Sequence, residues 1–123
     1  MSPVVVVAED DPAVLRAIER LLRDKCTVVS ALSAAKAVAA LRTMTHVDAV
    51  WADRSLPEPF GGAEVLATAA ELHPRAVLLM VTAEPHLALG LPRGAQVYAK
   101  PDLAHAAEGL LGLLGIGTAN QRA

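Results

Sequence analysis

The chain has 123 residues, of which 54% are hydrophobic and 2% aromatic, and this length and composition suit a single domain with an aliphatic core. Its formal net charge of −2 and its lack of a Lys/Arg cluster argue against direct binding to nucleic acid. Cys26, the one cysteine, has no partner for an internal disulfide, and no apolar run reaches the roughly 20 residues that span a membrane. Together with the lack of a signal-peptide pattern, these features predict a soluble cytoplasmic domain.

Short apolar segments alternate with amphipathic segments along the chain. The β-branched run at residues 3–8 predicts a strand that is covered on both faces. Asp11 and Pro12 then provide an N-cap acceptor and a proline at the first helical position, which is typical of a helix start. Further strands are predicted over residues 26–31, 47–52, 76–82 and 95–99, and further helices over residues 33–44, 63–73 and 103–115. This alternation predicts an α/β domain with a parallel sheet and helices on both faces.

One segment interrupts the pattern. Residues 84–94 stand where a helix between the fourth and fifth strands is expected, but they include Pro85, Pro92 and two glycines. Proline and glycine at these positions allow at most one or two helical turns. We expect the domain to comprise residues 1–115, followed by a tail or the start of a linker over residues 116–123.

Polar residues stand at the carboxyl ends of four predicted strands, which meet at one edge of a parallel sheet. They are Glu9 and Asp10 after the first strand, Asp53 after the third, Thr82 at the end of the fourth and Lys100 after the fifth. Clustered carboxylates repel one another unless a positive group intervenes, and Mg²⁺ suits such oxygen ligands. Lys100 and Thr82 supply a charge and a donor for a phosphoryl group. Asp53, the most central carboxylate, is the best candidate for a nucleophile.

Four segments in this order, VVVVAEDDPAVLRAIERLL, WADRSLPEPFGG, MVTAE and YAKP, make the chain resemble a receiver domain of the bacterial response regulators. The resemblance covers essentially the whole chain. It implies a flavodoxin-like, doubly wound, five-stranded parallel sheet of strand order 2-1-3-4-5, here with a shortened or degraded fourth helix. It also implies a signalling domain that catalyses its own phosphoryl transfer, with no independent substrate turnover.

The resemblance assigns an acceptor and a metal site. Asp53 matches the aspartate that accepts the phosphoryl group. Glu9 and Asp10 match the acidic pair that binds Mg²⁺, directly or through water, together with Asp53. Ser55 matches the position whose backbone carbonyl completes the metal site.

The resemblance also assigns a switch, where this chain departs from the family. Thr82 matches the hydroxyl that moves to the phosphoryl group, and Lys100 matches the lysine that pairs with it. The family's aromatic switch residue stands three residues before the lysine, where this chain has Val97. The segment from Thr82 to Lys100 is also several residues shorter than is usual in the family. Tyr98 is the alternative, but a shift of one residue changes the face of a strand. The sequence leaves open whether Tyr98 reaches the face that the switch uses.

Two functions follow from these observations. The leading prediction is a phospho-accepting domain of two-component signalling, which takes a phosphoryl group from a sensor histidine kinase or phosphotransfer protein and signals to a downstream protein, as a monomer or weak homodimer. The alternative is a pseudo-receiver, a phosphorylation-insensitive interaction module that docks through residues 84–94. A flavin or dinucleotide enzyme is disfavoured because the loop Glu9–Asp11 repels phosphate without a metal. A phosphatase is disfavoured because Ser55 stands where a second acid is expected.

Overall fold

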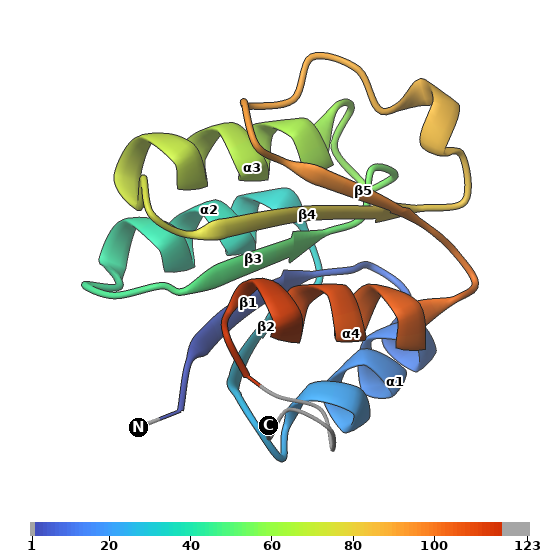
Figure 1. The fold of residues 1–123 in the computed structure, drawn as a ribbon. Helices are drawn as coiled ribbons and strands as arrows, with labels where there is room; N and C mark the ends of the chain where they lie inside the picture. The colour runs from blue at the N-terminus through green and yellow to red at the C-terminus, as the bar shows by residue number, and fades with distance from the viewer. Residues whose placement is uncertain (1, 117–123) are drawn as a thin grey trace.

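The computed structural model describes residues 2–116; Met1 and residues 117–123 lie outside the described part. Within it, strands and helices alternate in three layers (Figure 1). The strands are β1 (Val4–Ala8), β2 (Thr27–Ala31), β3 (Ala49–Ala52), β4 (Val77–Thr82) and β5 (Gln96–Ala99). The α-helices are α1 (Pro12–Leu22), α2 (Ala34–Thr43), α3 (Gly61–Leu72) and α4 (Leu103–Leu113), and a short 3-10 turn, η1, covers Pro85–Leu87.

All five strands are parallel and form one sheet of order β2-β1-β3-β4-β5. This confirms the predicted parallel sheet and its strand order. The central strands β1 and β3 are almost entirely buried, since each has a neighbour on both sides and helices over both faces. Their continuous apolar sequences therefore follow from burial on both faces.

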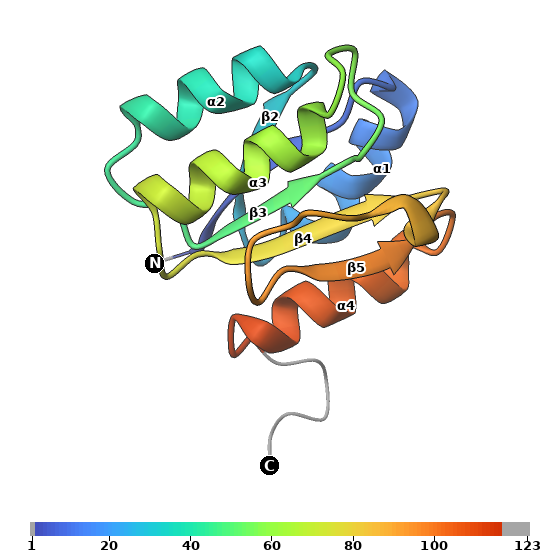
Figure 2. The same ribbon diagram turned by 90° about the horizontal axis from the view of Figure 1, so that it is seen from above.

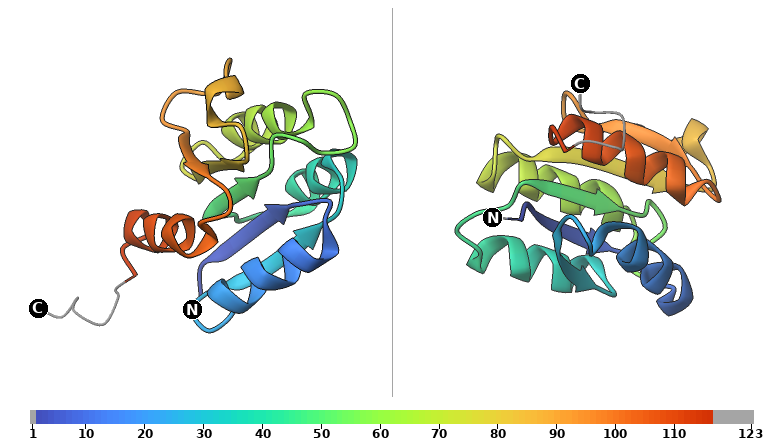
Figure 3. Two further views of the ribbon diagram at one scale, coloured as in Figure 1. Left: turned by 90° about the vertical axis from the view of Figure 1, so that its right-hand side faces the viewer. Right: turned by 60° about the horizontal axis from the view of Figure 1, so that its bottom comes forward.

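Helices α2 and α3 cover one face of the sheet, and α1 and α4 cover the other (Figures 2 and 3). Alternate residues of each strand serve the two faces. In β1, for example, Val6 packs into the core beneath α2 and α3, whereas Val5 and Val7 pack into the core beneath α1 and α4. Trp51 of β3 is fully buried in the second of these cores.

The helix starts follow local chemistry where a side chain is available to cap them. The side chain of Asp11 accepts hydrogen bonds from the backbone N–H groups of Ala13 and Val14, as predicted for an N-cap. Ser33 caps α2 in the same way by accepting from the N–H of Lys36.

Helix α3 begins two residues before the predicted start at residue 63. Its N-cap residue, Phe60, has left-handed backbone (φ 57°) and makes no side-chain capping bond. Gly61 and Gly62, which resemble loop residues in the sequence, form the buried first turn of the helix. The prediction was wrong here because the glycines are required by close packing rather than by a turn.

The crossover between β4 and β5, residues 83–95, contains the single turn η1 and no longer helix. This confirms the predicted loss of most of the helix at this position. Pro85 stands at the start of the turn, and the chain then passes through Gly90 with φ of +71°. Two leucines of the crossover remain accessible, with Leu87 43% and Leu89 77% exposed.

The last described residues close α4. Gly115 has φ of +76°, the left-handed conformation that commonly follows a helix, and Ile116 donates its backbone N–H to the carbonyl of Leu111 at 2.8 Å. Ile116, the first residue of the predicted tail, also packs against the core beneath α1 and α4. The rest of that tail, residues 117–123, lies outside the described residues. Among the helices of residues 2–116, none combines the length and apolar character needed to cross a membrane.

Candidate functional site

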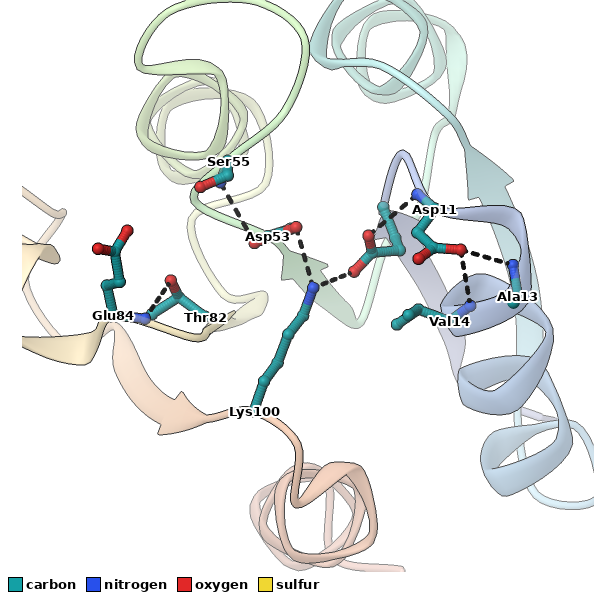
Figure 4. A network of polar contacts seen from close by, with 9 residues as sticks. Asp11, Ala13, Val14, Asp53, Ser55, Thr82, Glu84 and Lys100 are labelled. Carbon is teal, nitrogen blue, oxygen red and sulfur yellow. Dashed lines mark hydrogen bonds and ion pairs between the residues drawn. The ribbon is translucent and has the colours of Figure 1, made fainter.

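The carboxyl edge of the sheet brings together three of the predicted site residues. The ammonium group of Lys100, just after β5, lies 2.8 Å from Glu9 Oε1 and 3.0 Å from Asp53 Oδ2. Figure 4 shows Lys100 reaching from one strand end to the carboxylates that follow β1 and β3. Residues 9, 53 and 100 are far apart in sequence, so the parallel topology creates this ion-pair network.

Burial and ion pairing together shift the pKa of Glu9 and of Lys100. Glu9 is 1% and Asp53 5% exposed. Burial raises the pKa of Glu9, and the hydrogen bond from Lys100 partly offsets this effect. For Lys100, burial alone would lower the pKa, but its hydrogen bonds and attraction to Glu9 and Asp53 outweigh burial and leave the pKa raised. Lys100 is therefore held as a cation between two buried carboxyl groups.

A third acid completes a possible metal site. Glu9, Asp10 and Asp53 each offer a carboxylate oxygen, and these atoms lie within 4.8 Å of one another. Asp10 is exposed, whereas the other two are buried, so the cluster opens to solvent on one side. Several hard oxygen donors that leave room for water match the preference of Mg²⁺, so this donor set fits the predicted ion.

Backbone groups hold two of these acids. The backbone N–H of Ser55 donates to Asp53 Oδ1 at 3.2 Å, and that of Asp11 donates to Glu9 Oε2 at 3.1 Å. The structure thus places Ser55 against Asp53. Its backbone carbonyl as a metal ligand stays a prediction.

Thr82 ends β4 at the same edge and is 1% exposed. Its Oγ1 accepts a hydrogen bond from the backbone N–H of Glu84 at 3.1 Å (Figure 4). The side chain of Glu84 forms an ion pair with Arg54, the residue after Asp53, with 2.7 Å between Arg54 Nη2 and Glu84 Oε1. Sequence reasoning missed Arg54. The available signal was the pair of opposite charges: Arg54 follows β3 and Glu84 follows β4, and these two strands are neighbours in the sheet.

The loop after Asp53 is held by two further residues that the sequence analysis did not single out. Glu58 accepts hydrogen bonds from the first N–H groups of α2, those of Ala34 and Ala35, each at 2.9 Å. These bonds lower the pKa of Glu58. Gly62 packs so closely that a Cβ atom there would clash with the carbonyl oxygen of Asp53 and lie 2.9 Å from the Cα of Arg54.

The structure answers where Tyr98 points. Tyr98 pairs in register with Val81 and packs into the core beneath α1 and α4, with its ring edge-on to His105 of α4 at 5.3 Å between centroids. Val97 instead pairs with Met80 and, by alternation, lies on the face that also includes Thr82. A switch role of Tyr98 would therefore have to act through α4.

A family model described as the response regulator receiver domain matches residues 5–95. The chain belongs to this family, so it is a receiver domain of two-component signalling, a class of signalling modules that partner histidine kinases or phosphotransfer proteins. No curated protein matches it in sequence.

Solved structures have the same fold. A response regulator receiver protein from Sinorhizobium medicae WSM419 is 24% identical with a TM-score of 0.81, covering 93% of this chain and 95% of that one. A CheY-like receiver domain protein from Methanospirillum hungatei JF-1 is 21% identical with a TM-score of 0.77, covering 94% and 95%. The flavodoxin-like fold predicted from the sequence is thereby confirmed.

Proposed function

We propose that Asp53 accepts a phosphoryl group from the phosphohistidine of a sensor histidine kinase or a phosphotransfer protein. The observation that carries this proposal is the position of the Lys100 ammonium between Asp53 and Glu9, with Asp10 close enough to share a cation. An ammonium group and a cluster of carboxylates at the edge of a parallel sheet are the components that phosphoryl transfer to a carboxylate requires.

The chain's own residues supply most of the chemistry. An oxygen of Asp53 attacks phosphorus in line with the phosphohistidine nitrogen, so that a P–O bond forms as the P–N bond breaks and its electron pair returns to the imidazole. Lys100 Nζ, now 3.0 Å from Asp53 Oδ2, offsets the negative charge of the transferring oxygens. The Ser55 N–H on Asp53 Oδ1 keeps the carboxylate oriented for this attack.

Glu9, Asp10, Asp53 and the backbone carbonyl of Ser55 are the groups proposed to hold Mg²⁺. When bound, the ion supplies positive charge that stabilises the phosphoryl oxygens. Three clustered acids with one lysine carry excess negative charge, and a divalent cation offsets this excess.

Phosphorylation is proposed to act through Thr82. A hydroxyl at the end of β4 can donate to a phosphoryl oxygen on Asp53, and this new bond favours one of two conformers that exist before phosphorylation. The changed conformer would then be recognised by a downstream protein in the cytoplasm, with the receiver acting as a monomer or weak homodimer.

The test is the intact mass of the protein after incubation with acetyl phosphate and Mg²⁺, beside an Asp53→Asn control. We expect wild type alone to gain one phosphoryl group, and chelation of the metal to prevent the gain. Fluorescence of Trp51, the only tryptophan and two residues before the acceptor, reports any accompanying conformational change. A gain in Asp53→Asn equal to wild type would show that another residue is the acceptor.

The alternative is a pseudo-receiver that docks a partner without responding to phosphorylation. The observation that favours it is the exposure of Leu87 and Leu89 in the crossover that lacks its helix. This alternative predicts either no mass gain or a mass gain without any change in Trp51 fluorescence. Mass gain with a fluorescence change that Thr82→Ala abolishes would rule it out.

A further inference from the structure

The ion pair of Arg54 and Glu84 joins the loop after β3 to the loop after β4, next to the proposed acceptor. Arg54 Nη2 lies 2.7 Å from Glu84 Oε1, with the two side chains 28% and 50% exposed. An ion pair as accessible as this adds little to overall stability, because water screens it. Its main physical effect is to fix the positions of the two loops relative to each other.

Glu84 connects this ion pair to Thr82. Its carboxylate contacts Arg54, while its backbone N–H donates to Thr82 Oγ1 at 3.1 Å. A threonine hydroxyl has one donor hydrogen and two acceptor lone pairs. Because the Glu84 amide occupies one lone pair, the hydroxyl hydrogen points away from that amide and stays available for another acceptor. The orientation of this donor therefore depends on where Glu84 is held.

We propose that Arg54 is a positioning residue which, through Glu84, orients the Thr82 hydroxyl to donate to the phosphoryl group on Asp53. The inference rests on the proposed function, since it requires a phosphoryl group at Asp53. Arg54 itself needs no contact with that group. Its contribution is to reduce the reorientation that Thr82 must undergo when charge develops on the phosphoryl oxygens.

The test is a double-mutant cycle on the initial rate of phosphorylation by acetyl phosphate with Mg²⁺, followed by intact mass. Arg54→Gln and Glu84→Gln should each slow the reaction about fivefold, which corresponds to roughly 1 kcal/mol. Thr82→Ala should also slow it. In the Thr82→Ala background, Arg54→Gln should have no further effect, because the hydroxyl that it positions is gone.

Three controls separate orientation from other effects. Arg93→Gln removes an exposed arginine from the neighbouring crossover and should leave the rate unchanged. Thr82→Ser keeps the hydroxyl but removes the buried methyl group, so it measures the contribution of packing. Arg54→Lys keeps the charge and should recover part of the lost rate. Circular dichroism of each variant establishes that it is folded before the rates are compared.

The outcomes distinguish this inference from the proposed function. If wild type gains no phosphoryl group, both fail. If wild type is phosphorylated and Arg54→Gln reacts equally fast or faster, only the positioning role is overturned. If Arg54→Gln slows the reaction by the same factor with and without the Thr82 hydroxyl, the ion pair acts by another route, and the inference is again overturned.

Discussion

The loop after β3, residues 53–60, and the crossover between β4 and β5, residues 83–95, lie next to each other at the carboxyl edge of the sheet but are held very differently. In the first segment, the Ser55 N–H donates to the side chain of Asp53, and Glu58 accepts from the first N–H groups of α2. The segment then leads directly into α3, where Gly62 packs tightly against the backbone of Asp53. The crossover has one 3-10 turn and leaves Leu89 77% exposed. Internal contacts thus fix the loop over residues 53–60, called below the acceptor loop because it carries the proposed acceptor, whereas fewer contacts hold the crossover. Apolar surface is accessible in both segments, since Phe60 at the end of the acceptor loop is 84% exposed.

A hollow of about 170 Å³ separates the two segments. Its lining comes from the loop after β3, from α3, from β4 and from the crossover: Arg54, Phe60, Ala63, Met80, Leu87, Ala88, Leu89 and Leu91. The ion pair between Arg54 and Glu84 bridges the same two segments. The two segments are therefore linked by this ion pair beside an apolar hollow, and mutations can test how differently the two segments contribute to stability.

The largest effect is expected at Gly62. In Gly62→Ala the new methyl group would clash with the carbonyl oxygen of Asp53, and both groups lie in backbone that cannot move independently. We expect a loss of about 3 kcal/mol in the free energy of unfolding, together with slower phosphorylation, because relieving the clash displaces Asp53, the proposed acceptor. Urea unfolding and the acetyl phosphate rate measure the two effects.

Gly112→Ala is the matched control. Gly112 lies near the end of α4, and a Cβ atom there would meet nothing within 4 Å. Alanine is favoured over glycine in a helix, so this variant should be unchanged or more stable by up to about 1 kcal/mol. If both variants behaved alike, the close approach of Gly62 to Asp53 would not be what holds the loop.

The second largest effect is expected for Lys100→Met, which leaves two buried carboxyl groups without their cation. We expect this variant to lose about 2 kcal/mol of stability at pH 7. The loss should depend on pH. Burial raises the pKa of Glu9 above 4.5, so stability is lost as pH rises through that raised pKa. Lys100 lowers the pKa of Glu9. Without it, ionisation of Glu9 destabilises the folded state more, and stability continues to fall up to a higher pH.

Urea unfolding at pH 4.5, 5.5 and 7 should therefore show the gap between wild type and Lys100→Met widening as pH rises. In wild type, because the pKa of Lys100 is raised, its own stabilising effect is fully present below pH 10.5 and is lost as pH rises through the raised pKa. Lys36→Met, at an exposed lysine of α2, should show no such pH dependence. A gap that stays constant between pH 4.5 and pH 7 would contradict the burial of Glu9 as its source.

Much of this site could be predicted from the sequence because its chemistry stands at strand ends. Apolar runs such as residues 3–8 locate the strands, and parallel topology then brings Glu9, Asp53 and Lys100 to one edge. Pro85 and Pro92 likewise indicated the missing helix, since proline acts locally on the backbone. In each case one short segment carries the information.

The supporting contacts could not be predicted in the same way, because their partners are set by packing between segments that are distant in sequence. Glu58 lies 24 residues from Ala34, whose N–H it accepts, and Arg54 lies 30 residues from Glu84. Gly62 looks like part of a turn until the fold brings it against Asp53. Sequence alone could not assign Tyr98 to one face of the sheet, because a shift of one residue along β5 exchanges the two faces. Only the pairing of β5 with β4 determines this register.

A smaller effect is expected for Glu58→Gln, which weakens the link between the acceptor loop and α2. Glutamine keeps one acceptor oxygen but loses the charge that favours the start of a helix. Because hydrogen bonds from Ala35 and Ala34 lower the pKa of Glu58, its stabilising effect is present above pH 4.5 and is lost as pH falls through the lowered pKa. The variant should therefore have a lower melting temperature than wild type at pH 7, and the difference should shrink at pH 3. Glu71→Gln, exposed at the far end of α3, should show neither change.

The smallest effect is expected in the crossover. Leu89 is 77% exposed, so Leu89→Ser removes little packing and should change the free energy of unfolding by no more than about 0.5 kcal/mol. The rate of phosphorylation should also stay at the wild-type value, because Leu89 is exposed and has no part in the ion-pair network of Glu9, Asp53 and Lys100. A loss above about 1 kcal/mol would show that the crossover is packed as firmly as the acceptor loop. A near-zero loss beside the large effect of Gly62→Ala would instead show that the packing around the acceptor loop stabilises the fold and that the packing of Leu89 in the crossover does not.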